Sequence, residues 1–284
     1  MTKKFNITTQ DGFTLSATNF APEDAPIAGI IINSATAVKQ GYYAKFAKYL
    51  AEQGYLVLTY DYRGIGESSI KNYRDPRLSM RAWGEQDFSA VIDWSMSNFS
   101  NLDWHCIGHS VGGQIIGFAP NNTRLKSIFC VSSQSGYWGH WESFAKPKMF
   151  FLWYFVIPLF SKLIGKVPGF LLGGESLPAG VAQQWAYWGR HADYIVDRKG
   201  KPIRQGFSQL ECAIKFLMID DDKDFAPPKA VMALRRFYNN ANTSLETLNT
   251  KDLGKKHIGH FGFFRSENKS NLWVLPLKWL SDFA

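Results

Sequence analysis

A serine lies between two glycines in the run Gly108-His109-Ser110-Val111-Gly112, after an apolar segment and before one with helical character. A serine hydroxyl is a weak nucleophile until a histidine takes its proton and an acid orients that histidine. Both groups follow later in the chain, because a cluster of aspartates comes after the apolar residues 213–219 and His260 lies near the end. The order serine, acid, histidine predicts nucleophilic catalysis of acyl transfer at Ser110.

There is a physical reason for glycine at two positions of this run. In a sharp turn from strand to helix the serine takes a strained backbone conformation, and its neighbours at two positions before and after must be small. Gly108 and Gly112 occupy those positions. The five-residue pattern alone also fits an ordinary tight turn. The surrounding strands, acid and histidine favour the nucleophile interpretation.

Two histidines compete for the role of general base. His260, in the run Gly259-His260-Phe261, is preferred to His257 three residues earlier. The other histidines are predicted to pack in the core or lie on the surface: His105, His109, His140 and His191.

The acid remains open between two aspartates. Counting from the preceding strand identifies Asp222, whereas counting back four residues from Pro228 identifies Asp224. We give a narrow preference to Asp222 and expect the other aspartates of the loop to be solvated.

The elements that must position these residues alternate along the chain. Residues 5–9 and 13–18, on either side of Asp11-Gly12, predict a β-hairpin. Continuous apolar runs then alternate with helical spacing, which predicts an α/β protein with a mostly parallel sheet. The predicted strands are residues 28–33, 55–60, 104–107, 125–131, 213–219 and 244–248, and the predicted helices are residues 42–53, 79–99, 114–118, 228–239 and 271–283.

The alternation stops between residues 134 and 204, where no clear strand is predicted. This segment contains five of the ten tryptophans and many turn-forming glycines and prolines. We expect a helical cap of residues 134–204 inserted into a core of residues 1–133 and 205–284. Its predicted contribution to a substrate pocket comes from Trp138, Phe151, Trp153 and Trp185.

Several runs resemble the α/β-hydrolase superfamily over nearly the whole chain. They are "DYRGIGES" at residues 61–68, "GHSVGG" at the elbow and "GHFGFF" around His260. The runs "NSATAVKQGYYAKFAKYLAEQGY", "SMRAWGEQD", "QSGYWGHW" and "LPAGVAQQW" are similar to bacterial α/β hydrolases related to the serine aminopeptidase and monoacylglycerol lipase branches. The resemblance implies an α/β-hydrolase fold and a serine hydrolase that forms an acyl-enzyme.

The resemblance also implies an oxyanion hole with two backbone donors. One is the N–H of Val111, directly after the nucleophile. By position the other is the N–H of Ala35, although a His-Gly pair usual in the superfamily is replaced here by Asn33-Ser34. The hydroxyls of Ser34 and Thr36 could assist, and helix capping is the alternative role for Thr36.

Three functions are weighed. The first is cleavage of a small-molecule carboxylic ester with an apolar or lipid-like acyl group. The second is amide or peptide cleavage of the aminopeptidase type, with Glu142 or Glu175 holding the amine. The third is a catalytically inactive ligand-binding homologue, which the intact Ser110 and His260 disfavour.

Composition limits the partners. The net charge of +8 is scattered along the chain, so no nucleic-acid partner is expected. Cys106, Cys130 and Cys212 are expected to be buried, reduced thiols, and with no signal peptide expected the predicted location is cytoplasmic. No metal or cofactor is expected, because no zinc-type spacing or calcium-loop glycine is found.

The longest apolar run, residues 149–160, is too short to span a bilayer. It is interpreted as a wall of the pocket, as the packing core of the cap, or as a face in weak contact with a membrane surface. Lysines suited to that contact are Lys146, Lys148, Lys162 and Lys166.

Overall fold

The computed structural model describes residues 1–283. The strands are β1 (Thr2–Thr8), β2 (Thr14–Phe20), β3 (Ala28–Asn33), β4 (Tyr55–Tyr60), β5 (Trp104–His109), β6 (Ser127–Val131), β7 (Lys166–Val167), β8 (Leu177–Pro178), β9 (Ala213–Ile219) and β10 (Asn242–Leu248). The α-helices are α1 (Ala44–Glu52), α2 (Met80–Ala82), α3 (Ser89–Asn98), α4 (Val111–Gln114), α5 (Ala145–Phe151), α6 (Ile157–Ile164), α7 (Gly169–Leu172), α8 (Ala179–Gly189), α9 (Gln205–Ser208), α10 (Pro228–Arg235), α11 (Gly259–Gly262), α12 (Lys269–Leu272) and α13 (Val274–Leu280).

The central sheet has eight strands within residues 1–283, in the order β1-β2-β4-β3-β5-β6-β9-β10. The hairpin β1–β2 is antiparallel and β2 pairs antiparallel with β4, whereas every pair from β4 to β10 is parallel. The predicted fold class is therefore confirmed. Because the strands from β4 onward are parallel, their carboxyl ends meet at one edge, where loops can bring distant residues together.

Both faces of the sheet are covered, as the continuous apolar runs predict. In β3, Ile31 packs with the apolar cluster that includes Val91 of α3. Its neighbour Ile30 packs on the opposite face with Phe46 and Leu50 of α1. Successive strand residues thus pack into two separate apolar layers. The edge at the carboxyl ends of the strands remains available for a functional site.

Two predicted helices differ from the structure. The elbow helix α4 ends at Gln114 and the chain continues as a 3-10 helix, Ile116–Phe118, instead of one helix over residues 114–118. Glycine at three positions of this stretch weakens a regular helix. The last helix is divided into α12 and α13, since Pro276 has no N–H to donate to the carbonyl of Leu272.

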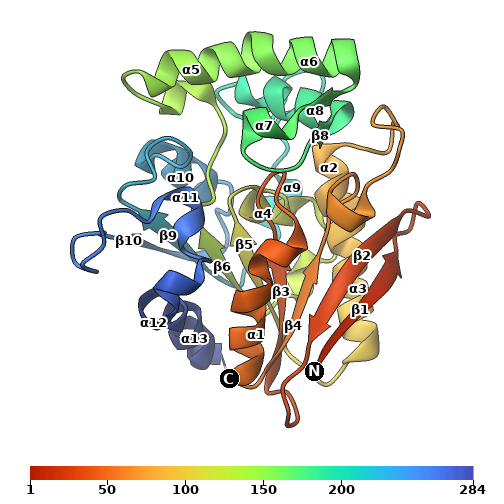
Figure 1. Cartoon of the computed structure of the whole chain (residues 1–284), viewed down its shortest axis with the longest axis vertical. Helices are drawn as coiled ribbons and strands as arrows, with labels where there is room; N and C mark the ends of the chain where they lie inside the picture. The colour runs from red at the N-terminus through yellow and green to blue at the C-terminus, as the bar shows by residue number, and fades with distance from the viewer. Residues whose placement is uncertain (284) are drawn as a thin grey trace.

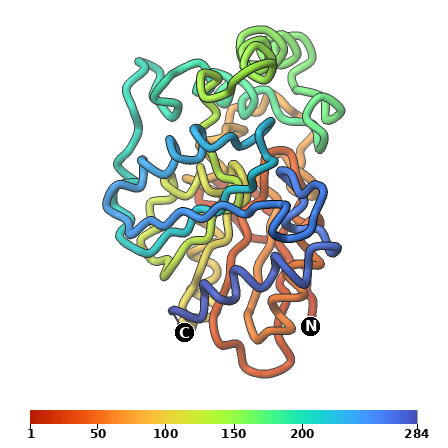
Figure 2. The backbone as a smooth tube through the Cα atoms, turned by 90° about the vertical axis from the view of Figure 1, so that its left-hand side faces the viewer, coloured from red at the N-terminus to blue at the C-terminus, as the bar shows by residue number. Residues whose placement is uncertain are grey.

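The segment between β6 and β9 lies over the carboxyl ends of the strands (Figure 1). Figure 2, turned by 90°, shows the same green segment above the sheet. We call residues 134–204 the cap region. Helices α5 and α6 join through a π-helical turn, Leu152–Val156, into one helix of 20 residues, Ala145–Ile164.

Two details of this region differ from the sequence prediction. A short antiparallel pair, β7 with β8, occurs where no strand was expected. The cap helix Ala145–Ile164 is also longer than the apolar run of residues 149–160, because flanking lysines continue the helix. By length and composition it reaches the size that crosses a membrane.

The cysteines carry free thiols. Cys106 and Cys130 are buried as expected, and Cys212 is half-buried.

Candidate active site

Ser110 is the hinge between β5 and α4. Its backbone has φ 53° and ψ −117°, a conformation that L-residues rarely adopt. The strain is held from both sides, because Ser110 N–H donates to the carbonyl of Val131 at 3.0 Å and Ser110 C=O accepts from Gly113 N–H at 3.1 Å. The side chain is 6% exposed. The sequence prediction of a strained serine turn at this position agrees with this geometry.

The two flanking glycines are required by space. A Cβ on Gly112 would lie 2.2 Å from the carbonyl oxygen of Asn33 in β3. A Cβ on Gly108 would lie 2.8 Å from the backbone nitrogen of Gly113. Strand and helix therefore approach each other at the spacing that the glycines permit.

His260 lies on the short helix α11 and pairs with Asp222 in the loop that follows β9. The distance from His260 Nδ1 to Asp222 Oδ2 is 2.6 Å, and both side chains are buried. Because a carboxylate accepts hydrogen bonds, Nδ1 carries the proton and Nε2 of the neutral ring is free to accept one. Phe225 stacks on the imidazole with ring centroids 5.0 Å apart, which fixes the plane of the ring.

The other candidates of the acidic loop lie elsewhere. Asp224 lines the cavity described below, and its carbonyl accepts from the indole of Trp141 at 2.8 Å. Asp221 accepts from the N–H groups of Ile258 and Gly259 at 2.9 and 2.8 Å, and pairs with the exposed His257. Although burial acts to raise the pKa of Asp221, these donors hold it below its ordinary value. Asp221 thus fastens the histidine loop to the strand end.

His109, predicted to pack beneath the elbow, does so through both ring nitrogens. Nε2 lies 2.9 Å from the carbonyl oxygen of His260, and Nδ1 lies 2.8 Å from the hydroxyl of Tyr43. Burial, with the nearby ring of His260, lowers the pKa of His109 well below its ordinary value, so the ring is neutral. A carbonyl only accepts, so Nε2 carries the proton and Tyr43 donates to Nδ1.

The N–H of Ala35 donates to the same Tyr43 hydroxyl at 2.8 Å. In this structure the N–H that the sequence analysis assigned to the oxyanion hole is therefore engaged with Tyr43, although Ala35 lines the cavity with Ser110. The neighbouring Thr36 lines the cavity with Ser110, and its Oγ1 is buried without a hydrogen-bond partner among residues 1–283. The N–H of Val111 is the first of α4 and has no acceptor within that helix.

One cavity of about 530 Å³ contains both Ser110 and His260 in its wall. Three of the four predicted pocket residues line it, namely Phe151, Trp153 and Trp185. Trp138 does not, and this prediction is wrong: its ring packs on Phe150, with centroids 5.2 Å apart. The remaining wall is formed by Ala35, Thr36, Gln134, Gly136, Trp141, Lys148, Met149, Leu152, Val156, Leu171, Leu172, Gly173, Asp224, Phe225 and Phe261.

Gln134 was missed by the sequence analysis. Its Nε2 donates to Ser110 Oγ at 3.4 Å, and its Oε1 accepts from Gln114 at 3.5 Å. Gln114 in turn accepts from Tyr194, whose hydroxyl accepts from Trp185 at 2.9 Å. A chain of hydrogen bonds therefore runs from the cap helix α8 to the serine. No hydrogen bond joins Ser110 to His260 within the described residues, as is common in ligand-free sites.

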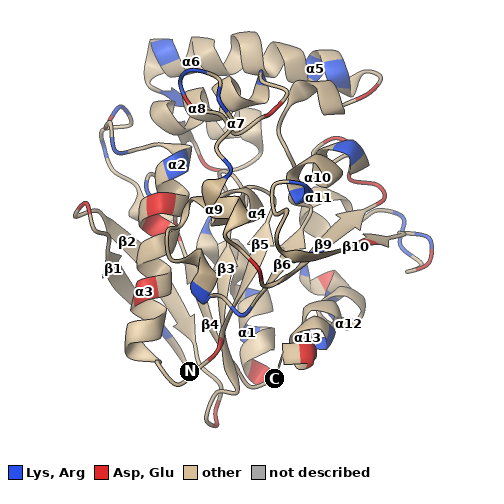
Figure 3. Ribbon diagram, turned by 180° about the vertical axis from the view of Figure 1, so that it is seen from behind, with Lys and Arg blue, Asp and Glu red and all other residues tan. Residues whose placement is uncertain are grey.

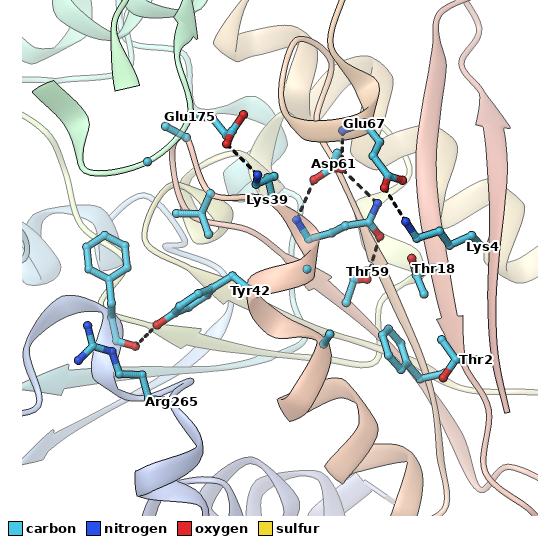
Figure 4. A pocket seen from close by; sticks show the side chains of 18 of the residues that line it. Thr2, Lys4, Thr18, Lys39, Tyr42, Thr59, Asp61, Glu67, Glu175 and Arg265 are labelled. Atoms are coloured by element: carbon cyan, nitrogen blue, oxygen red, sulfur yellow. Dashed lines mark hydrogen bonds and ion pairs between the residues drawn. The ribbon is translucent and has the colours of Figure 1, made fainter. Parts of the chain in front are cut away.

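A larger cavity of about 680 Å³ lies beside β2 and β4 (Figure 4). Four of its charged groups form two ion pairs: Lys39 with Glu175 at 3.0 Å, and Lys4 with Glu67. The buried carboxylate of Asp61 accepts from the N–H groups of Gln40 and Glu67 at 2.7 and 3.0 Å. The smaller cavity is therefore the better candidate, because it alone contains the serine and the histidine.

The remaining histidines have structural contacts. His105 is buried against Ser127, and His191 is bound to the carbonyl of Tyr187. His140 is half-buried in the cap region. Within residues 1–283 no group of three His, Cys, Asp or Glu side chains is arranged to hold a metal ion.

Known proteins resemble the chain in sequence and in fold. A family model described as serine aminopeptidase, S33, matches residues 24–164, just under half of the chain. No curated protein matches the chain. Among the solved structures that match the chain, three of those similar from end to end have 11–14% identity.

A structure of DcsB with its substrate analogue has 14% identity and a TM-score of 0.66, and the match covers 100% of both chains. A thermostable carboxyl esterase from Bacillus coagulans, in complex with glycerol, has 11% identity and a TM-score of 0.67, covering 99% of this chain and 98% of that one. An esterase from Exiguobacterium antarcticum has 14% identity and a TM-score of 0.63, covering 98% and 100%.

At these identities the structural likeness shows the fold. Together with the strand order and the serine elbow, it shows that the chain has the α/β-hydrolase fold. The family match and the fold support a hydrolase function.

Proposed function

We propose that the protein is a serine hydrolase that cleaves a carboxylic ester with an apolar or lipid-like acyl group. The proposal depends chiefly on the buried pair of His260 and Asp222, joined at 2.6 Å, because His260 lies in the same cavity wall as Ser110. Two of the similar structures are esterases, which supports ester cleavage over other hydrolase reactions.

In the proposed reaction Ser110 Oγ exchanges its contact with Gln134 for His260 Nε2, which takes the hydroxyl proton as Oγ attacks the ester carbonyl. Asp222 holds Nδ1–H and stabilises the imidazolium that forms. His260 then gives the proton to the leaving alcohol, and the acyl group stays on Ser110. Water attacks this acyl-enzyme with His260 as base, which releases the acid and restores the serine.

The oxyanion donors in this proposal are the backbone N–H of Val111 and the hydroxyl of Thr36. The Thr36 hydroxyl is supported by its position in the cavity wall and by its lack of another partner within the described chain. A hydroxyl can replace a backbone N–H in this role, and each donor contributes about 2.7–4 kcal/mol to the transition state.

The apolar walls of the cavity favour an apolar acyl group. Amide cleavage of the aminopeptidase type would need a carboxylate for the free amine. Glu142 and Glu175 pair with Lys229 and Lys39 outside this cavity. Asp224 is the one carboxylate among the described lining residues, and Lys148 lines the same space. This balance of charge disfavours selection of a cationic substrate.

Labelling with a fluorophosphonate probe tests the nucleophile, and p-nitrophenyl esters of increasing chain length test the substrate. We expect wild-type protein to be labelled and to prefer medium or long acyl chains, and Ser110→Ala to show neither property. Equal labelling of the two proteins, or an unlabelled wild type, would overturn the enzyme proposal. Faster turnover of aminoacyl p-nitroanilides than of any ester would replace the ester by the amide reaction.

A further inference from the structure

Large apolar side chains are exposed chiefly on one part of the molecule. Of the thirteen exposed large apolar residues in the described chain, nine fall within residues 144–171. Phe151, Phe155, Leu159 and Leu163 are between 55% and 67% exposed and follow at intervals of four, so they share one side of the cap helix. We call these four residues the cap face. A continuous apolar patch of this kind marks a contact surface, unlike single exposed residues.

The opposite side of the same helix is fixed to the protein. Trp153, Ile157 and Ser161, also four apart, are each fully buried. The indole of Trp153 donates to the carbonyl of Gly136 at 2.9 Å. The helix Ala145–Ile164 therefore lies flat on the molecule, and its composition fits a bilayer surface better than a crossing.

Positive charge frames the cap face. Lys146 and Lys148 lie near the start of the helix, and Lys162 and Lys166 lie at and just beyond its end. Figure 3 shows blue positions near both ends of the helix formed by α5 and α6, with an uncharged stretch between them. The helix contains no Asp or Glu, and none of its lysines takes part in an ion pair within residues 1–283. An apolar strip between unpaired lysines complements anionic lipid headgroups.

We propose that the cap face docks on the surface of an anionic lipid bilayer, with the helix lying parallel to the membrane plane. Phe155, Leu159 and Leu163 enter the acyl region, and the lysines at both ends bind headgroups. A second copy of this chain is the competing occupant. The unpaired lysines disfavour it, because two such faces would bring like charges together.

The cap face continues into the cavity that contains Ser110. Phe151 is exposed on the cap face and also lines that cavity. Leu171 of α7 is exposed as well and lines the same cavity. An apolar substrate can thus pass from the bilayer to the serine without crossing water. This delivery depends on the proposed function, whereas docking does not.

Vesicle flotation of the Ser110→Ala protein tests docking without turnover. We expect it to float with vesicles of phosphatidylcholine and phosphatidylglycerol, and raised salt should weaken binding. The variant Phe155→Ser/Leu159→Ser/Leu163→Ser changes residues outside the cavity, so we expect vesicle affinity to fall roughly tenfold or more. When the same three substitutions are made in the protein that keeps Ser110, we expect wild-type turnover of a short, soluble ester.

The matched control is Ile27→Ser/Met232→Ser, which removes exposed apolar side chains, 59% and 39% exposed, away from the cap. It should float like the parent protein. Docking is overturned if the parent stays in the soluble fraction, or if the triple variant floats equally well. It is also overturned if the triple substitution abolishes a dimer seen by light scattering while vesicle binding is unchanged. Docking can be lost while turnover is normal, or turnover can be lost while docking is normal. Either outcome separates this inference from the proposed function.

Discussion

His109 Nε2 lies 2.9 Å from the carbonyl oxygen of His260, so the residue before the serine holds the backbone of the histidine loop. The same ring accepts from Tyr43, and Tyr43 accepts from the N–H of Ala35. Three segments far apart in the sequence are thereby joined by one hydrogen-bond chain directly below the cavity. Each donor in this hydrogen-bond chain has a single acceptor, so the hydrogen bonds fix the relative position of these segments.

Replacing Tyr43 by Phe tests this chain. The substitution leaves His109 Nδ1 and the Ala35 N–H buried without partners, which costs about 1–3 kcal/mol. We expect the free energy of unfolding in urea to fall by that amount and kcat to fall with it. The control is Tyr55→Phe, because Tyr55 is 5% exposed and its hydroxyl makes no hydrogen bond within residues 1–283. Equal effects of the two substitutions would contradict the role of the Tyr43 hydroxyl.

The choice between the two aspartates is tested by amide substitution. Asp222→Asn presents an N–H to His260 and favours the wrong ring tautomer, so we expect kcat on a p-nitrophenyl ester to fall by roughly 10⁴. Asp224→Asn leaves the bond to His260 intact and should retain most of kcat. Near-ultraviolet circular dichroism of both variants checks the fold. A larger loss with Asp224→Asn would transfer the role of acid to Asp224.

Thr36→Val tests the second oxyanion donor. Valine has the shape of threonine without its hydroxyl, so we expect kcat to fall by roughly 10²–10³ with KM little changed. Thr36→Ser keeps the hydroxyl and is the matched control. An unchanged kcat in Thr36→Val would mean that the threonine hydroxyl has no part in the reaction.

The alternation of strands and helices and the serine turn could be predicted because both are local patterns. The apolar run of residues 28–33 is typical of a strand buried on both faces, as in a parallel sheet. Gly108 and Gly112 likewise indicate the serine turn, since a side chain at either position would overlap backbone atoms. Both requirements can be recognised from residues that are close together in the sequence.

The differences from the sequence predictions concern contacts that the local pattern does not specify. Ala35 stands at the expected position, but its N–H is taken by a tyrosine eight residues later. Trp138 and Trp141 are three residues apart with the same composition around them, and only Trp141 lines the cavity. Gln134 likewise meets Ser110 only once β5 and β6 are paired. These contacts depend on the direction of side chains in the folded chain.

The hairpin turn supplies a prediction about pH. Asp11 binds Arg63 through two contacts of 2.7 and 3.0 Å, and the side chain of Arg63 is fully buried. The hydrogen bond to Arg63 lowers the pKa of Asp11 to about 2. A carboxyl group whose pKa is lower in the folded state stabilises the fold above its unfolded pKa, near 3.9. That stabilisation is lost as the pH falls from about 4 through about 2.

Asp11→Asn should therefore lower the free energy of unfolding at neutral pH by about 1–3 kcal/mol. The loss stays below that of a fully buried pair because Arg63 keeps its contact with Asp87 and Asp11 is about 30% exposed. Urea unfolding across this pH range should show the gap between variant and wild type closing as Asp11 becomes protonated. Asp24→Asn, at an exposed position before β3, is the control and should follow the wild type. A gap that stays constant down to about pH 2 would mean that the effect of Asp11→Asn is not electrostatic.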